Sequence, residues 1–80
     1  MMDDAREIGY ALLIRRKRRG LSQAQLARLA GISRNYVSLI ERGGAANISM
    51  RIFMQLAKIL WDNPNEFMDL LWRVKGGNDE

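Results

Sequence analysis

The sequence contains no cysteine and no histidine among its 80 residues, and this excludes several kinds of chemistry. Without these residue types the chain cannot form a disulfide, a Cys/His zinc site, a thiol nucleophile or an imidazole base. Its carboxylates are scattered over separate segments, and no nucleophile lies beside a base. We therefore expect no enzyme, no metal site and no cofactor.

Long hydrophobic runs are also missing. The longest, such as Ala11 to Ile14, fall far short of the roughly 20 apolar residues that a membrane span needs. Asp3 and Asp4 occupy a region that is basic in a secretory signal. The C-terminal apolar segment carries too few charges for a helix that lies on a membrane surface. A reducing cytoplasm without membrane contact is the expected location.

Charge and composition are those of a small folded protein with a polyanionic partner. Thirteen Lys and Arg against nine Asp and Glu give a net charge of +4. This balance suits nucleic acid without being diagnostic of it. The hydrophobic fraction of 48% is ordinary for a globular chain. We predict one domain over residues 1–75 and a polar tail over residues 76–80.

Helix start and stop signals divide the chain into helix-length segments, and no β-hairpin signal lies between them. Ser22 and Gln25 form a capping box, and Ser33 follows the corner glycine Gly31. Pro64 falls at the first position of a helix that Asn63 can cap. The fold class is therefore all-α, with helices predicted over about 4–19, 23–30, 34–42, 50–60 and 64–75.

The segments 23–30 and 34–42 are joined by so short a glycine-containing turn that they must cross steeply. In the segment 34–42 the helical period places Val37 and Ile40 on the same side of the helix. The opposite face is short and polar, and begins with Arg34. A face of this kind is suited to contact with a polar, hydrated surface.

These segments resemble a known family. The residues that carry the likeness are Leu21-Ser22-Gln23, Leu26-Ala27, Gly31-Ile32-Ser33, Tyr36-Val37-Ser38 and Ile40-Glu41-Arg42-Gly43. This pattern resembles the Cro and phage-repressor (XRE) helix-turn-helix family, and the likeness runs from Gly9 to Phe67. It implies a five-helix, lambda-repressor-like domain that binds double-stranded DNA and regulates transcription on the nucleoid. Small size and a strong fifth helix make the chain similar to restriction-modification controller proteins.

The resemblance implies which side chains read bases. Arg can pair with guanine and Asn with adenine through two hydrogen bonds each. Ser38 is short enough to be neutral, and Leu39 can either contact a thymine methyl or pack on a neighbouring loop. The base contacts implied are Arg34, Asn35, Ser38 and Leu39.

Backbone contacts and a structural ion pair are implied in the same way. The phosphate contacts implied are Ser22, Gln23, Ser33, Tyr36, Arg42 and Asn47. Solvated surface positions are the alternative for Gln23, Arg42 and Asn47. The family's buried ion pair corresponds to Arg16 and Glu41. The basic run from Arg15 to Arg19 fans around its helix at about 100° per residue, so a solvated helix end explains most of it.

The predicted helix over 64–75 carries more large apolar side chains than a terminal helix needs to complete the core. We predict a two-fold homodimer through this surface on a palindromic operator, because exposed apolar patches mark interfaces. The residues assigned to the interface are Trp61, Met68, Leu70, Leu71, Trp72 and Val74. The alternative is that the second face packs on the chain's own helices. A protein-interaction module, such as a toxin-neutralising antitoxin that also binds DNA, is the rival function.

Overall fold

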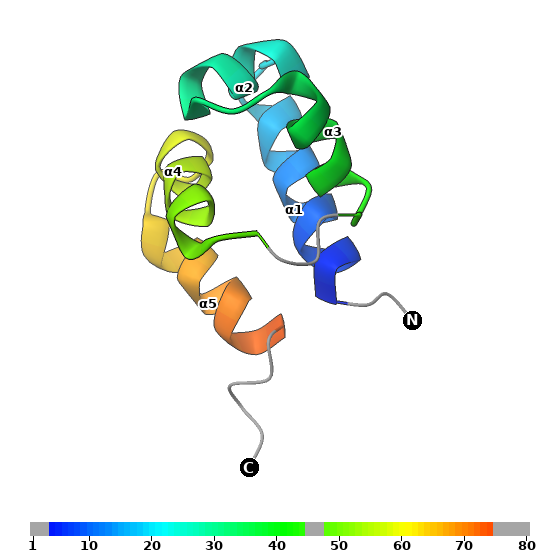
Figure 1. Ribbon diagram of the computed structural model, residues 1–80. Helices are drawn as coiled ribbons and strands as arrows, with labels where there is room; N and C mark the ends of the chain where they lie inside the picture. Colours follow the sequence, from blue (N-terminus) through cyan, green and yellow to red (C-terminus); the bar gives the residue numbers. More distant parts are fainter. Residues whose placement is uncertain (1–3, 45–47, 75–80) are drawn as a thin grey trace.

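The computed structural model describes residues 4–44 and 48–74, which form five α-helices and no strand (Figure 1). The helices are α1 (Asp4–Arg18), α2 (Gln23–Ala30), α3 (Arg34–Glu41), α4 (Met50–Leu60) and α5 (Pro64–Val74). The predicted all-α class is confirmed. Two helices end one residue earlier than expected, α1 at Arg18 and α3 at Glu41. Asn47, residue 75 and the predicted tail lie outside the described residues, as do the side chains of Leu71 and Val74.

Local capping signals fix the entry and exit of the short helices α2 and α3. Ser22 Oγ accepts from the Gln25 amide at 3.0 Å, and Gln25 Oε1 accepts from the Ser22 amide at 2.8 Å. Ser33 Oγ accepts from the Tyr36 amide at 3.0 Å. Between them Gly31 adopts φ 72°, a left-handed conformation that costs glycine little. The turn between the two helices is therefore specified by Gly31 and Ser33.

The core receives side chains from all five helices, and Phe67 of α5 is fully buried in it. Helix α1 contacts α3, α4 and α5, whereas α2 packs against α3 and α4. In Figure 1 α2 lies at one end of the molecule and α5 near the other. Helix α1 thus serves as the common support for the α2–α3 pair and for the terminal helix.

Helices α1 and α3 approach each other closely at Gly9. A Cβ atom added at Gly9 would lie 2.1 Å from the Ile40 carbonyl oxygen of α3. No side chain fits between two backbones at this separation. The absence of a side chain at Gly9 therefore sets the distance between α1 and α3.

Two residues of the basic run, Arg15 and Arg19, contact the end of α4 and so differ from the solvated helix end that we predicted, whereas Lys17 and Arg18 are exposed. Arg15 Nε donates to the Leu60 carbonyl oxygen at 3.2 Å, and Arg19 Nε donates to the same oxygen at 3.3 Å. Arg19 also pairs with Asp62 at 2.6 Å. These contacts satisfy a carbonyl that the α4 helix leaves unpaired at its C-terminus.

Trp61 does not belong to a dimer surface. It is only 7% exposed, its ring centroid lies 4.7 Å from that of Phe67, and the Arg15 guanidinium carbon lies 5.2 Å from its ring centroid. The prediction that Trp61 lines the interface is therefore wrong. Its ring is buried in the chain's own core because α5 folds back over the end of α4.

Candidate nucleic-acid interface

The first turn of α3 presents Arg34 and Asn35 to solvent. Both residues are exposed, and within residues 4–44 and 48–74 neither side chain makes a hydrogen bond or an ion pair. The Ser33 cap and the buried residues Val37 and Ile40 hold the helix that carries them. Two of the four side chains assigned to base contacts thus lie together at a helix end with their polar groups available.

Ser38 and Leu39 lie further along α3 and are half-buried. Ser38 Oγ accepts from Arg42 Nε at 3.3 Å. A Cβ atom at Gly44 would lie 2.6 Å from Leu39 Cδ1, and the Gly44 amide donates to the Leu39 carbonyl at 2.9 Å. Leu39 therefore packs on the loop that follows α3, which is the alternative to a thymine contact that the sequence left open.

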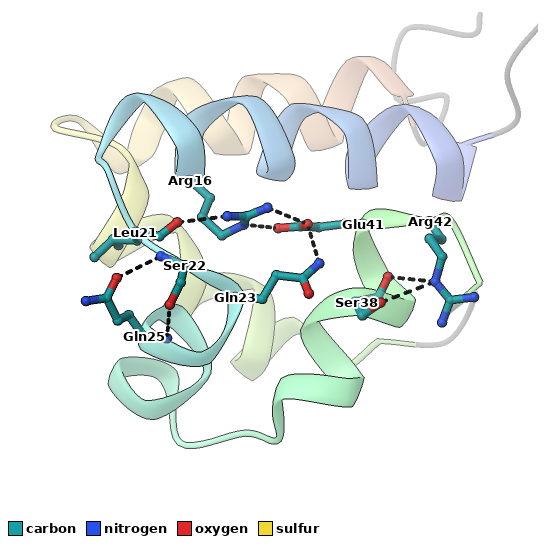
Figure 2. Close-up of polar contacts among 8 residues, drawn as sticks. All are labelled: Arg16, Leu21, Ser22, Gln23, Gln25, Ser38, Glu41 and Arg42. Carbon is teal, nitrogen blue, oxygen red and sulfur yellow. Dashed lines mark hydrogen bonds and ion pairs between the residues drawn. The ribbon is translucent and has the colours of Figure 1, made fainter.

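Arg16 and Glu41 form an ion pair that connects α1 to the end of α3 (Figure 2). Arg16 Nε lies 2.6 Å from Glu41 Oε2, and Arg16 Nη2 donates to Glu41 Oε1 at 3.1 Å. Arg16 Nη1 donates to the Leu21 carbonyl oxygen at 2.8 Å. All three nitrogens of the guanidinium are thus occupied within the structure, which assigns Arg16 to architecture.

Gln23, the first residue of α2, takes part in the same cluster. Its Nε2 donates to Glu41 Oε1 at 3.0 Å, and its side chain is half-buried. The sequence assigned Gln23 to a phosphate contact or to solvent and did not predict this hydrogen bond. No periodicity or spacing connects residues 23 and 41, so a single sequence holds no signal for it.

The other residues assigned to the DNA backbone differ in their surroundings. The hydroxyls of Ser22 and Ser33 accept from backbone amides as helix caps. Tyr36 is half-buried and packs against the core, whereas Arg42 is exposed and donates to the Ser38 carbonyl at 3.3 Å. Arg42 therefore keeps a guanidinium at the surface close to α3.

The charge of the α2–α3 unit is uniformly positive at its surface. Residues 21–44 contain Arg28, Arg34 and Arg42, all exposed, and Glu41 as the only acid. The Glu41 side chain is 3% exposed and is paired with Arg16. Because the only carboxylate in this segment is buried and compensated, the surface suits the phosphates of a nucleic acid.

Residues 12–60 match a sequence profile of the HTH_3 family, which is described as helix-turn-helix. The chain belongs to this helix-turn-helix family. The resemblance to XRE-type proteins that the sequence suggested is thereby confirmed, and the matched segment contains α2, α3 and α4. Only the second half of α1, residues 12–18, lies within it, and α5 lies outside. The narrower likeness to controller proteins therefore remains a prediction.

A curated relative of this helix-turn-helix chain is the HTH-type transcriptional regulator SlrR of Bacillus subtilis (strain 168). The two sequences are 34% identical over 77 residues, which cover 91% of this chain and 51% of SlrR. The chain therefore spans about half the length of the relative that it matches. Within the described part of the chain, no helix is both long enough and apolar enough to cross a membrane.

Proposed function

We propose that this helix-turn-helix protein is a sequence-specific DNA-binding transcriptional regulator that places α3 in the major groove. The observation that carries the proposal is the exposed pair Arg34 and Asn35 at the first turn of α3, within a unit whose only acid is buried. Arg and Asn are the side chains that pair most directly with guanine and adenine edges. A phage-type repressor or a restriction-modification controller is the class that we propose.

Phosphate contacts position α3 in this proposal. The N-terminal amides of α2 and the Gln23 side chain face one phosphate, because a helix N-terminus attracts anions. Ser22, Ser33, Tyr36, Arg42 and Asn47 are the further backbone contacts that we propose. Ser38 is assigned to a base beyond those that Arg34 and Asn35 reach, whereas Leu39, which packs on the loop after α3, is not.

Changing Arg34 to alanine should remove discrimination at one base pair of each half-site. The two hydrogen bonds of an arginine to guanine provide about 1–3 kcal/mol of discrimination. Because Arg34 is exposed, the unfolding midpoint should be unchanged. The measurement selects sites from a random duplex library with the wild-type protein. It then compares the affinities of Arg34→Ala for the selected site and for its single-base variants.

Arg28→Ala is the matched control, because Arg28 is an exposed arginine in the last turn of α2. It should retain wild-type discrimination at every base pair. If Arg34→Ala also retains it, Arg34 reads no base and the proposed orientation of α3 is wrong.

We also propose that the protein acts as a two-fold homodimer through α5. The support is Trp72, which is 66% exposed, with the half-buried Met68 one turn before it on the same side. Met68 and Leu70 also pack against the core, so the chain's own helices cover part of the apolar surface that the sequence assigned to the interface. A two-fold dimer would place two α3 helices about 34 Å apart, which suits a palindromic operator.

Trp72→Glu should convert the dimer to a monomer, because a two-fold interface contains each substituted position twice. Sedimentation equilibrium at tens of micromolar measures the change. Tyr10→Glu is the control, since Tyr10 is an exposed aromatic residue of α1 with 56% exposure and lies outside the proposed interface. A monomeric wild-type chain would contradict the α5 dimer. Its purification with a stoichiometric second protein would favour an interaction module instead.

A further inference from the structure

Glu41 is the point at which α1, α2 and α3 meet through polar contacts (Figure 2). Its Oε2 accepts from Arg16 Nε, and its Oε1 accepts from both Arg16 Nη2 and Gln23 Nε2, at 3.1 and 3.0 Å. The carboxylate is almost fully buried. One buried group therefore holds a guanidinium from α1 and an amide from the first residue of α2.

The hydrogen bond to Gln23 determines how the Gln23 amide is oriented. An ionised carboxylate only accepts hydrogen bonds, so the amide must turn its nitrogen, and not its oxygen, toward Glu41. One Nε2 hydrogen is then occupied, and the second Nε2 hydrogen remains for an external acceptor. Glutamine has three side-chain torsions, and fixing them before a partner arrives removes an entropic cost of binding.

The ion pair is complete without Gln23. Arg16 contributes two hydrogen bonds to Glu41 and a third to the Leu21 carbonyl, so the charge of Glu41 is already compensated. A glutamine at the first position of a helix can also extend into solvent. Its hydrogen bond to Glu41 is therefore not needed to compensate the buried charge. The bond instead fixes a polar side chain at the N-terminus of α2.

We propose that Glu41 is a positioning residue for DNA binding. It holds Gln23 so that the free Nε2 hydrogen, next to the N-terminal amides of α2, meets a phosphate oxygen. Arg16 holds Glu41 in place, and thereby connects the packing of α1 on α3 to the phosphate contact. This inference rests on the proposed function, because it requires the chain to bind DNA.

A double-mutant cycle tests the coupling. The probe is a fluorescein-labelled duplex that carries a site selected by the wild-type protein, and the variants are Gln23→Ala, Glu41→Gln and the two together. Each single change should weaken binding by about tenfold, the effect of one lost hydrogen bond to a charged group. The double variant should bind no more weakly than the weaker single variant, because Glu41 acts through Gln23. Arg42→Ala is the control. In the double variant Gln23→Ala/Arg42→Ala the two losses of DNA affinity should multiply, because these side chains act independently.

Nuclear magnetic resonance of the free wild-type protein tests the orientation without any substitution at Glu41. One of the two side-chain amide protons of Gln23, assigned by their disappearance in Gln23→Ala, should lie downfield of its position in an exposed glutamine and should exchange slowly with solvent. Gln25 provides the internal comparison, because only its Oε1 is engaged, by the Ser22 amide. Two fast-exchanging protons at the shifts of an exposed glutamine would overturn the inference, even if Glu41→Gln unfolds the chain.

Site selection and the double-mutant cycle separate DNA binding from the positioning role of Glu41. A wild-type chain that selects no duplex overturns the proposed function and this inference together. A wild-type chain that selects a site, with losses in Gln23→Ala and Glu41→Gln that multiply in the double variant, overturns only the positioning role of Glu41.

Discussion

Replacing Arg16 with methionine is expected to destabilise the fold by about 3–5 kcal/mol. Glu41 would keep its charge in a site where its side chain is 3% exposed, with Gln23 as its remaining hydrogen-bond donor. The Leu21 carbonyl would also lose the donor that Arg16 Nη1 provides. A domain of this size typically has about 4–12 kcal/mol of stability, so the loss is a large fraction of the total and the unfolding midpoint should fall clearly.

Denaturant unfolding followed by circular dichroism measures this effect. Arg18→Met is the matched control, because Arg18 is an exposed arginine on the same helix and should change stability by less than about 0.5 kcal/mol. The double variant Arg16→Met/Glu41→Leu should recover most of the loss, since it leaves no buried charge. Equal midpoints for Arg16→Met and Arg18→Met would show that the ion pair contributes nothing to stability.

The helix-turn-helix unit could be predicted from the sequence because its determinants are local. The caps at Ser22 and Ser33 act within three residues, and Gly31 acts on its own backbone. The same locality explains why the exposure of Arg34 and Asn35 could be expected. Their place on the helix follows from the period of α3, and the buried side of α3 follows from Val37 and Ile40.

The contacts of the basic run could not be predicted, because they depend on where another helix ends. Arg15 and Arg19 meet the Leu60 carbonyl only because α4 terminates beside the last turn of α1. Trp61 is buried for the same reason, since the chain turns there and returns as α5. A count of apolar residues shows that a helix has excess hydrophobic surface. It does not show whether a second copy or the chain's own helices cover that surface.

The polar cluster at Glu41 shows a second limit. The resemblance implied the pair of Arg16 and Glu41, because the family carries it. The bond from Gln23 to Glu41 depends on the crossing of α2 over α3, and a sequence pattern does not contain that crossing angle. This is where the structure adds most to the function, because the cluster connects an architectural pair to a residue assigned to DNA.

Gly9→Ala is the second change for which we expect a large effect, about 3 kcal/mol of destabilisation, at the upper end of what overpacking costs. In an exposed helix the same change would stabilise the protein by about 1 kcal/mol, because alanine favours the helix more than glycine does. At Gly9 the new Cβ would lie 2.1 Å from the Ile40 carbonyl oxygen, and this neighbour is backbone that cannot turn aside. Helices α1 and α3 would have to separate.

Whether Gly9→Ala lowers or raises the stability of the protein decides this prediction. Thermal unfolding of Gly9→Ala and of one control variant is therefore sufficient. Ala11→Gly, at a half-buried position of the same helix, measures mainly the helix-propensity term and should cost about 0.5–1 kcal/mol. If Gly9→Ala raises stability by a similar amount, α1 and α3 are not in backbone contact. If it lowers stability as expected, the separation should also stretch the contact between Arg16 and Glu41. DNA affinity should then fall even where the variant remains folded, because α3 carries both Glu41 and the residues assigned to the bases.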